Sequence, residues 1–103
     1  MLFKDAVFRA FEDMFIYLGI DIIYQPRGAA PFTITGVLKN PETSYVLGES
    51  DVVRQAISIA VRSCDVEPRV GDLIVLDEKT YKIYREPLLD GYDYIWKIEA
   101  TLV

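Results

Sequence analysis

The sequence contains no histidine and a single cysteine, Cys64, among its 103 residues. Without histidine, the chain lacks the most common general base, the most common metal ligand and the side chain that titrates near neutral pH. A lone cysteine excludes an intramolecular disulfide and a zinc site built from several thiolates. Both absences argue against the most common kinds of hydrolase and metalloenzyme.

Positive charge is also scarce, because 11 lysines and arginines stand against 16 aspartates and glutamates, a formal net charge of −5. A protein that binds DNA or RNA on its own usually neutralises phosphates with clustered basic residues, so this balance argues against that class. No apolar run approaches the roughly 20 residues of a membrane span, and the charged N-terminus lacks the apolar segment of a signal peptide. We therefore expect a soluble intracellular domain that is not an enzyme.

Apolar residues are abundant and make up 51% of the chain. This length and composition suffice for one ordinary core, so we predict a single domain over residues 1–103. Residues 2–18 carry apolar side chains at steps of three and four, the period of an amphipathic helix. The predicted apolar stripe consists of Phe3, Val7, Ala10, Phe11, Met14 and Leu18. Phe8, Phe15 and Tyr17 lie off this stripe and are candidates for contact with a partner.

Gly19 follows the last periodic residue, at a position where a left-handed cap often ends a helix. From residue 20 onward the apolar period changes to two, which is typical of strands. Strands are predicted at residues 20–25, 32–39, 53–61, 73–76, 80–85 and 94–103. A helix competes at residues 53–61, but the β-branched content favours a strand. Residues 43–51 show no periodicity and are predicted to form a loop.

The spacing of these segments predicts the fold class. Residues 73–76 and 80–85 are joined by the short connection Asp77-Glu78-Lys79, a pattern that indicates a β-hairpin. One helix followed by five or six antiparallel strands indicates the α+β class. We predict an N-terminal helix packed on a small antiparallel β-barrel or sandwich.

Acidic residues are the main candidates for catalysis or cation binding. Asp90 and Asp93 flank a Gly-Tyr pair in a predicted loop and could hold a cation or act as acid and base. Asp-Gly is also typical of turns, and metal sites recruit more oxygen ligands than this loop supplies. An enzyme would have to use Asp72 or Asp90, but the turns and strand ends of an acidic protein offer such residues in any case. We therefore predict no catalytic residue, no metal site and no cofactor.

The single thiol has acidic neighbours. Asp65 and Glu67 lie next to Cys64 in the sequence. Negative charge raises the pKa of a thiol, which is the wrong direction for a nucleophile. We therefore expect Cys64 to be a half-buried structural residue.

Aromatic side chains gather in the last quarter of the chain. They are Tyr81, Tyr84, Tyr92, Tyr94 and Trp96. Such residues can stack on nucleic-acid bases, anchor a protein interface or fill a core. Because the nearby lysines and arginines are matched by as many acids, core and interface roles are favoured over base stacking.

The order of these pieces resembles a known family. Residues 36–42 read Gly-Val-Leu-Lys-Asn-Pro-Glu, and residues 69–74 read Arg-Val-Gly-Asp-Leu-Ile. A hairpin with Tyr81 follows, and Asp90-Gly91 precedes a last strand that carries Trp96. Together they resemble the lambda-like head–tail joining proteins of long-tailed phages. The sequence departs from that pattern in its acidic turn at residues 77–79, where the family has a glycine, and in the loop after residue 42.

This resemblance implies a structural virion protein of a tailed phage or prophage, assembled in the cytoplasm of the bacterial host. It implies a β-barrel with one helix that forms a ring, expected to be a hexamer, in the neck between the DNA-filled head and the tail. The implied partners are further copies of the chain, the portal-side head adaptor, and the tail terminator or tail tube. DNA would only pass through the lumen. Candidate interface residues are Phe8, Phe15, Tyr17, Tyr45, Tyr84 and Tyr92.

Two other interpretations stay open at this point. The chain could be a small β-barrel module that binds a peptide or single-stranded nucleic acid, which requires an exposed aromatic strip beside a basic groove. It could also be a tail-terminator or tail-tube protein, since these are related in fold to the neck proteins.

Overall fold

A computed structural model describes residues 2–39, 44–47 and 53–103 of the chain. Its helix, α1, spans Leu2–Leu18, as the sequence predicts. The strands are β1 (Ile20–Gln25), β2 (Phe32–Leu38), β3 (Ser44–Leu47), β4 (Val53–Arg62), β5 (Leu73–Leu76), β6 (Lys79–Ile83), β7 (Leu88–Leu89) and β8 (Ile95–Leu102). In the described part of the chain, no helix is long and apolar enough to cross a bilayer.

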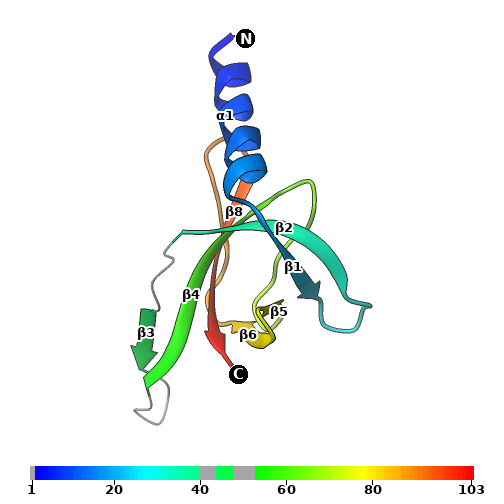
Figure 1. The fold of residues 1–103 in the computed structure, drawn as a ribbon, viewed down its shortest axis with the longest axis vertical. Coiled ribbons are helices and arrows are strands. Elements are labelled where there is room, and N and C mark those ends of the chain that lie inside the picture. The colour runs from blue at the N-terminus through cyan, green and yellow to red at the C-terminus, as the bar shows by residue number, and fades with distance from the viewer. Residues whose placement is uncertain (1, 40–43, 48–52) are drawn as a thin grey trace.

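Six of the strands close into an antiparallel barrel in the order β4-β2-β1-β5-β6-β8, and pairing of β8 with β4 completes the circle. The short strands β3 and β7 extend the sheet beside β4 and β8. Figure 1 shows α1 standing at one end of this barrel, with β5, β6 and the C-terminus toward the other end. The predicted α+β class and the predicted helix-on-barrel architecture are confirmed.

The prediction of an unbroken loop at residues 43–51 was wrong in part, because β3 lies within it. β4 is ten residues long and runs past the end of β2, whose pairing with β4 stops at Leu38 and Ile59. β3 pairs with the part of β4 that β2 leaves open, from Ser44 opposite Ala56 to Leu47 opposite Val53. A four-residue strand is too short to show a clear period in the sequence. Residues 43 and 48–51 lie outside the described residues.

The interior of the barrel is the main hydrophobic core. Alternate residues of each strand point inward, as expected for a pleated strand. Its fully buried side chains include Ile22, Tyr24, Ile59, Ile74, Ile83 and Ile98. Half-buried Trp96 and Leu102 of β8 also pack against this core.

A second, smaller core lies between α1 and the outside of the barrel. Phe15 is 4% exposed and packs with Val37 of β2, Ala60 of β4 and Ile95 of β8. Because these positions face away from the barrel interior, β4 and β8 are buried on both faces where the helix covers them. Phe11 and Met14 complete this core.

The predicted stripe of α1 was therefore wrong in part. Phe15 lies in the packed face, whereas Leu18 and Ala10, which were assigned to that face, are exposed. When apolar residues occur on several sides of a helix, the 3.6-residue period does not determine which side is buried. The partner surface, not the helix itself, selects which of them are buried.

The end of α1 depends on Gly19, although not through a left-handed cap. Its φ angle is not positive, and its N–H donates to the carbonyl of Phe15 at 3.1 Å. A Cβ at this position would lie 2.2 Å from the Phe15 carbonyl oxygen and 2.5 Å from Cγ2 of Thr35. Glycine is therefore required by the close approach of the helix to β2.

Candidate interaction surface

The turn at residues 69–72 holds a buried carboxylate. Asp72 is 4% exposed and accepts hydrogen bonds from the Tyr24 hydroxyl and, at 3.0 Å, from the backbone N–H of Arg27. The Arg69 N–H in turn donates to the Tyr24 hydroxyl oxygen at 3.2 Å. Both carboxylate oxygens are thus used in fastening β1 to the turn before β5. Asp72, which an enzyme would have needed as an acid or base, therefore has a structural role in this fold.

The backbone conformation at position 71 explains why the same motif carries a glycine there. Its φ is +96°, a conformation that favours glycine. Its N–H donates to the carbonyl of Ile83 at 2.9 Å, and a Cβ would lie 3.0 Å from the side chain of Arg27. The Gly-Asp pair at residues 71–72 therefore forms a folding motif that joins β1, β5 and β6.

Tyr24 is strongly affected by this environment. Burial, together with its hydrogen bond to Asp72, raises the pKa of the Tyr24 phenol well above its ordinary value. The phenol remains protonated at neutral pH and acts as a hydrogen-bond donor. It stabilises the buried carboxylate beside it.

The loop that carries Asp90 and Asp93 is a turn. One carboxylate oxygen of Asp90 accepts from the N–H groups of Tyr94 at 2.8 Å and Ile95 at 3.2 Å. Asp93 has a φ of 56°, and its N–H donates to the Asp90 carbonyl at 3.1 Å. Within the described ranges, no three metal-ligating side chains lie together. The arrangement of this loop matches the turn interpretation.

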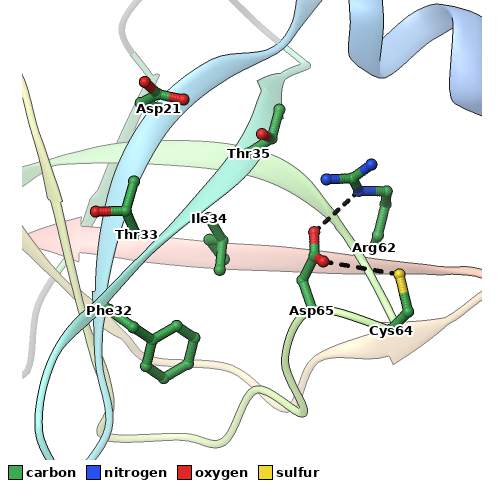
Figure 2. A pocket seen from close by; sticks show the side chains of 8 residues that line it. All are labelled: Asp21, Phe32, Thr33, Ile34, Thr35, Arg62, Cys64 and Asp65. Atoms are coloured by element: carbon green, nitrogen blue, oxygen red, sulfur yellow. Dashed lines mark hydrogen bonds and ion pairs between the residues drawn. The ribbon is translucent and has the colours of Figure 1, made fainter.

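A shallow groove of about 360 Å³ lies beside the ends of β1, β2 and β4. Figure 2 shows Cys64, Asp65 and Arg62 on one side of it and Asp21 with the β2 residues on the other. The Cys64 thiol lies 3.7 Å from a carboxylate oxygen of Asp65, and partial loss of contact with water, followed by the negative charge of this carboxylate, raises the pKa of the thiol. The predicted direction of this shift is confirmed, but Cys64 is exposed, not half-buried. The groove therefore does not hold an activated nucleophile.

Arg62 uses its charge within the protein. Its guanidinium lies 2.9 Å from Asp65 and 3.6 Å from Glu12 of α1, and it also stands 5.3 Å from the centre of the Phe15 ring. These contacts connect α1 to the end of β4. Arg62 is thus a helix-anchoring residue and has little capacity left for an anionic ligand.

Two of the predicted interface aromatics, Phe8 and Tyr92, instead meet within the chain. Phe8 stacks on Tyr94 with ring centres 5.0 Å apart, and Phe11 stacks on the same ring at 5.5 Å. Tyr92 approaches both phenylalanines edge-on, at 6.4 Å and 6.3 Å. This aromatic cluster attaches α1 to the loop before β8. Tyr94 is one of the C-terminal aromatics for which the sequence favoured a core or interface role, and it packs against the smaller core.

The other candidates are dispersed. Phe15 is buried within the chain itself and offers almost no surface to a partner. Tyr84 is exposed, with the Arg85 guanidinium 5.5 Å from its ring centre. Tyr45 lies in β3 opposite Gln55, and its side chain is outside the described part of the chain. Tyr17 is 81% exposed.

The end of α1 carries exposed apolar residues that the sequence pattern did not single out. Ile16 and Leu18, on either side of Tyr17, are 69% and 64% exposed. Three consecutive large apolar side chains in water are unusual for a monomeric surface. A signal was available in the sequence, since three such residues in succession cannot all share one helix face.

The family described as Phage Head-Tail Attachment protein matches residues 3–100. Among solved structures, the chain is similar to the phage-like element PBSX protein xkdH from Bacillus subtilis. The two share 12% identity with a TM-score of 0.49, over 82% of this chain and 91% of that chain. No curated protein matches the chain. Because the family match covers nearly the whole sequence, the chain belongs to the phage head–tail attachment proteins, a family of structural virion proteins.

Proposed function

We propose that this protein forms a ring in the neck of a tailed phage or prophage and joins the DNA-filled head to the tail. The ring is a hexamer that binds the portal-side head adaptor on one side and the tail terminator or tail tube on the other. Copies assemble onto heads in the host cytoplasm. The family match over residues 3–100 is the observation that carries this proposal.

Exposed apolar side chains support assembly into a larger structure. Ile16, Tyr17 and Leu18 at the end of α1, together with Ile23 of β1, present large apolar groups to solvent. Neighbouring copies or ring partners would remove this surface from water, at about 25 cal/mol for each Å² buried. A connector needs such surfaces more than it needs a pocket.

The net charge suits a channel for DNA. Six copies at −5 each amount to about −30, and like charge along a lumen prevents a polyanion from adhering to the wall. The protein would then guide DNA without binding it. This role differs from that of a nucleic-acid-binding module.

The carboxylates that an enzyme would need are used for structure. Asp72 is hydrogen-bonded on both oxygens, and Asp90 accepts two backbone N–H groups with one oxygen. We therefore propose that the protein is not an enzyme and uses no cofactor. Its function depends on contacts between proteins.

The binding-module interpretation requires an exposed aromatic strip. Tyr81 is buried, and Trp96 is half-buried against the barrel core. Neither ring is available to stack on a base. The burial of these residues favours the connector over an oligonucleotide-binding barrel.

A complementation experiment tests the proposal. Purified protein is added to heads of its own phage that lack the joining protein, together with free tails, and infective particles are counted. We expect infectivity to be restored. If heads and tails remain separate while a neck protein from a control phage joins its own parts, the proposal is contradicted.

A further inference from the structure

The outside of the barrel is covered by α1 on one side only. The helix packs over β2, β4 and β8 through Val37, Ala60 and Ile95. Among the described residues, no helix covers the outward side chains of β1, β5 and β6. In the strand register, Ile23 lies between Thr33 and Val75, and Val75 lies opposite Thr80. These four uncharged residues form a continuous outward row across β2, β1, β5 and β6.

A groove of about 620 Å³ adjoins this row. Its walls include Gln25 of β1, Leu73 of β5 and Lys82 of β6, which are adjacent in the register, and also Arg27 and Val103. The lining side chains are apolar, neutral or basic, and none is an aspartate or glutamate. Lys82 is exposed and forms no ion pair among the described residues. The groove thus combines apolar surface with unpaired positive charge.

The C-terminal end of α1 combines apolar side chains with negative charge, and is thus opposite in charge to the groove. Ile16, Tyr17 and Leu18 project into solvent, and Asp13 lies one turn before Tyr17 on the same side of the helix. Asp13 is exposed and, in the described part of the chain, forms no ion pair. Arg9 lies one further turn from the helix end. This end therefore presents an apolar knob with an acid beside it.

We infer that the end of α1 in one copy docks into the groove of β1, β5 and β6 in the next copy. This inference rests on the proposed ring and names its contact. Tyr17 enters the groove over Leu73 and Val103, and Asp13 pairs with Lys82 of the neighbour.

The geometry of the molecule favours a repeating contact. Figure 1 shows the C-terminal end of α1 where the helix joins the barrel, with β5 and β6 toward the opposite end of the barrel, so one copy can use both surfaces at once. Two different surfaces that meet head to tail generate a ring when the rotation closes. A twofold contact between two helix ends would instead bring Asp13 near its own counterpart and leave both grooves empty.

Charge reversal tests this contact. The full-length variants Asp13→Lys and Lys82→Asp are each added to heads that lack the joining protein, and infective particles are counted. Ring formation is measured in parallel by cross-linking the copies bound to heads. Each variant should lower infectivity about tenfold or more, because it places like charges together in every contact of the ring. The double variant Asp13→Lys/Lys82→Asp should recover to within about threefold of the wild type.

A mixture of the two single variants gives a sharper result. In an even-numbered ring whose copies alternate, every contact joins either two wild-type or two reversed residues. The mixture should therefore recover activity that neither variant has alone. The variants Glu86→Lys and Lys97→Asp are matched controls, since both residues are exposed and lie outside the two surfaces. Thermal unfolding of each variant verifies that it is folded.

The possible outcomes separate the two proposals. In one outcome, wild-type rings form while the charge reversals have no effect, or while the double variant and the mixture do not recover infectivity. Either result refutes the contact between Asp13 and Lys82 but still supports the proposed ring. If the wild-type protein neither forms rings on heads nor joins them to tails, the proposed function itself fails.

Discussion

The Tyr24 hydroxyl on β1 donates a hydrogen bond to the Asp72 carboxylate, 48 residues later in the chain. The pair lies in the interior beside the turn that begins β5, and Arg27 and Arg69 complete its hydrogen bonds. Burying a carboxylate costs free energy unless its oxygens accept hydrogen bonds, as both oxygens of Asp72 do here. The contact therefore fixes how β1, β5 and β6 meet.

Replacing Tyr24 by phenylalanine should destabilise the fold. The Tyr24→Phe variant keeps the aromatic side chain but leaves the Asp72 carboxylate without one hydrogen-bond donor. This loss should lower the free energy of unfolding by roughly 1–3 kcal/mol. Urea unfolding followed by circular dichroism measures the change. Tyr84→Phe is the matched control and should leave the free energy of unfolding unchanged, because Tyr84 is on the surface. Equal stability of both variants would show that the buried pair has no structural role.

Stability should fall at alkaline pH. Burial and the bond to Asp72 raise the pKa of Tyr24 above its ordinary value of 10.0, so the folded protein holds this proton more tightly than the unfolded chain does. The stabilisation is fully present below about pH 10 and is lost as pH rises through the folded pKa. Burial raises the pKa of Tyr81 as well. Urea midpoints should therefore decline above about pH 10, with a shallower decline in Tyr24→Phe; identical slopes in both proteins would count against this account.

The β5–β6 hairpin offers a stabilising substitution. Leu76 pairs with Lys79, and the two residues between them, Asp77 and Glu78, have φ angles of 52° and 65°. Glycine is favoured at the second of these positions in such a turn. Glu78→Gly should raise the free energy of unfolding by about 0.5–1 kcal/mol, because relief of the left-handed strain outweighs the extra freedom of glycine in the unfolded chain. The control variant Lys79→Gly, one position later and within β6, should lower the free energy of unfolding. If Glu78→Gly does not stabilise the protein, the proposed effect of the turn geometry is contradicted.

Phe15 and Tyr17 should separate folding from assembly. Phe15→Ala removes a buried ring from the contact between α1 and the barrel and should cost about 3–5 kcal/mol of stability. Tyr17→Ala changes an exposed side chain and should alter stability by less than about 0.5 kcal/mol. Only the second variant should fold normally and yet fail to join heads to tails. Normal joining by folded Tyr17→Ala would remove Tyr17 from the proposed interface.

The fold could be predicted largely from local patterns. The helix at Leu2–Leu18 and the strands β4 and β8 each carry a period long enough to be read directly. Closure of the barrel could not be predicted, since it depends on the pairing of β4 with β8 across 40 residues of chain or so. The short strand β3 was missed because it is defined by its partner and not by a pattern of its own.

The candidate surface was less predictable. Tyr17 was correctly placed off the buried stripe, but Phe15 was grouped with it and is buried. The choice between them depends on where Val37, Ala60 and Ile95 meet the helix, which is a tertiary property. The motif at residues 69–72 indicated the family, while its physical reason, the buried Asp72, became clear only from the structure.

The central claim is that this chain forms a ring at the junction of head and tail. Electron cryomicroscopy of the phage neck, with a small tag added to this protein, tests it most directly. We predict a closed ring of six copies between the portal side and the tail, with the tag density repeated around it. Tag density on the capsid shell or the tail tip, or purified virions without the protein, would contradict the claim.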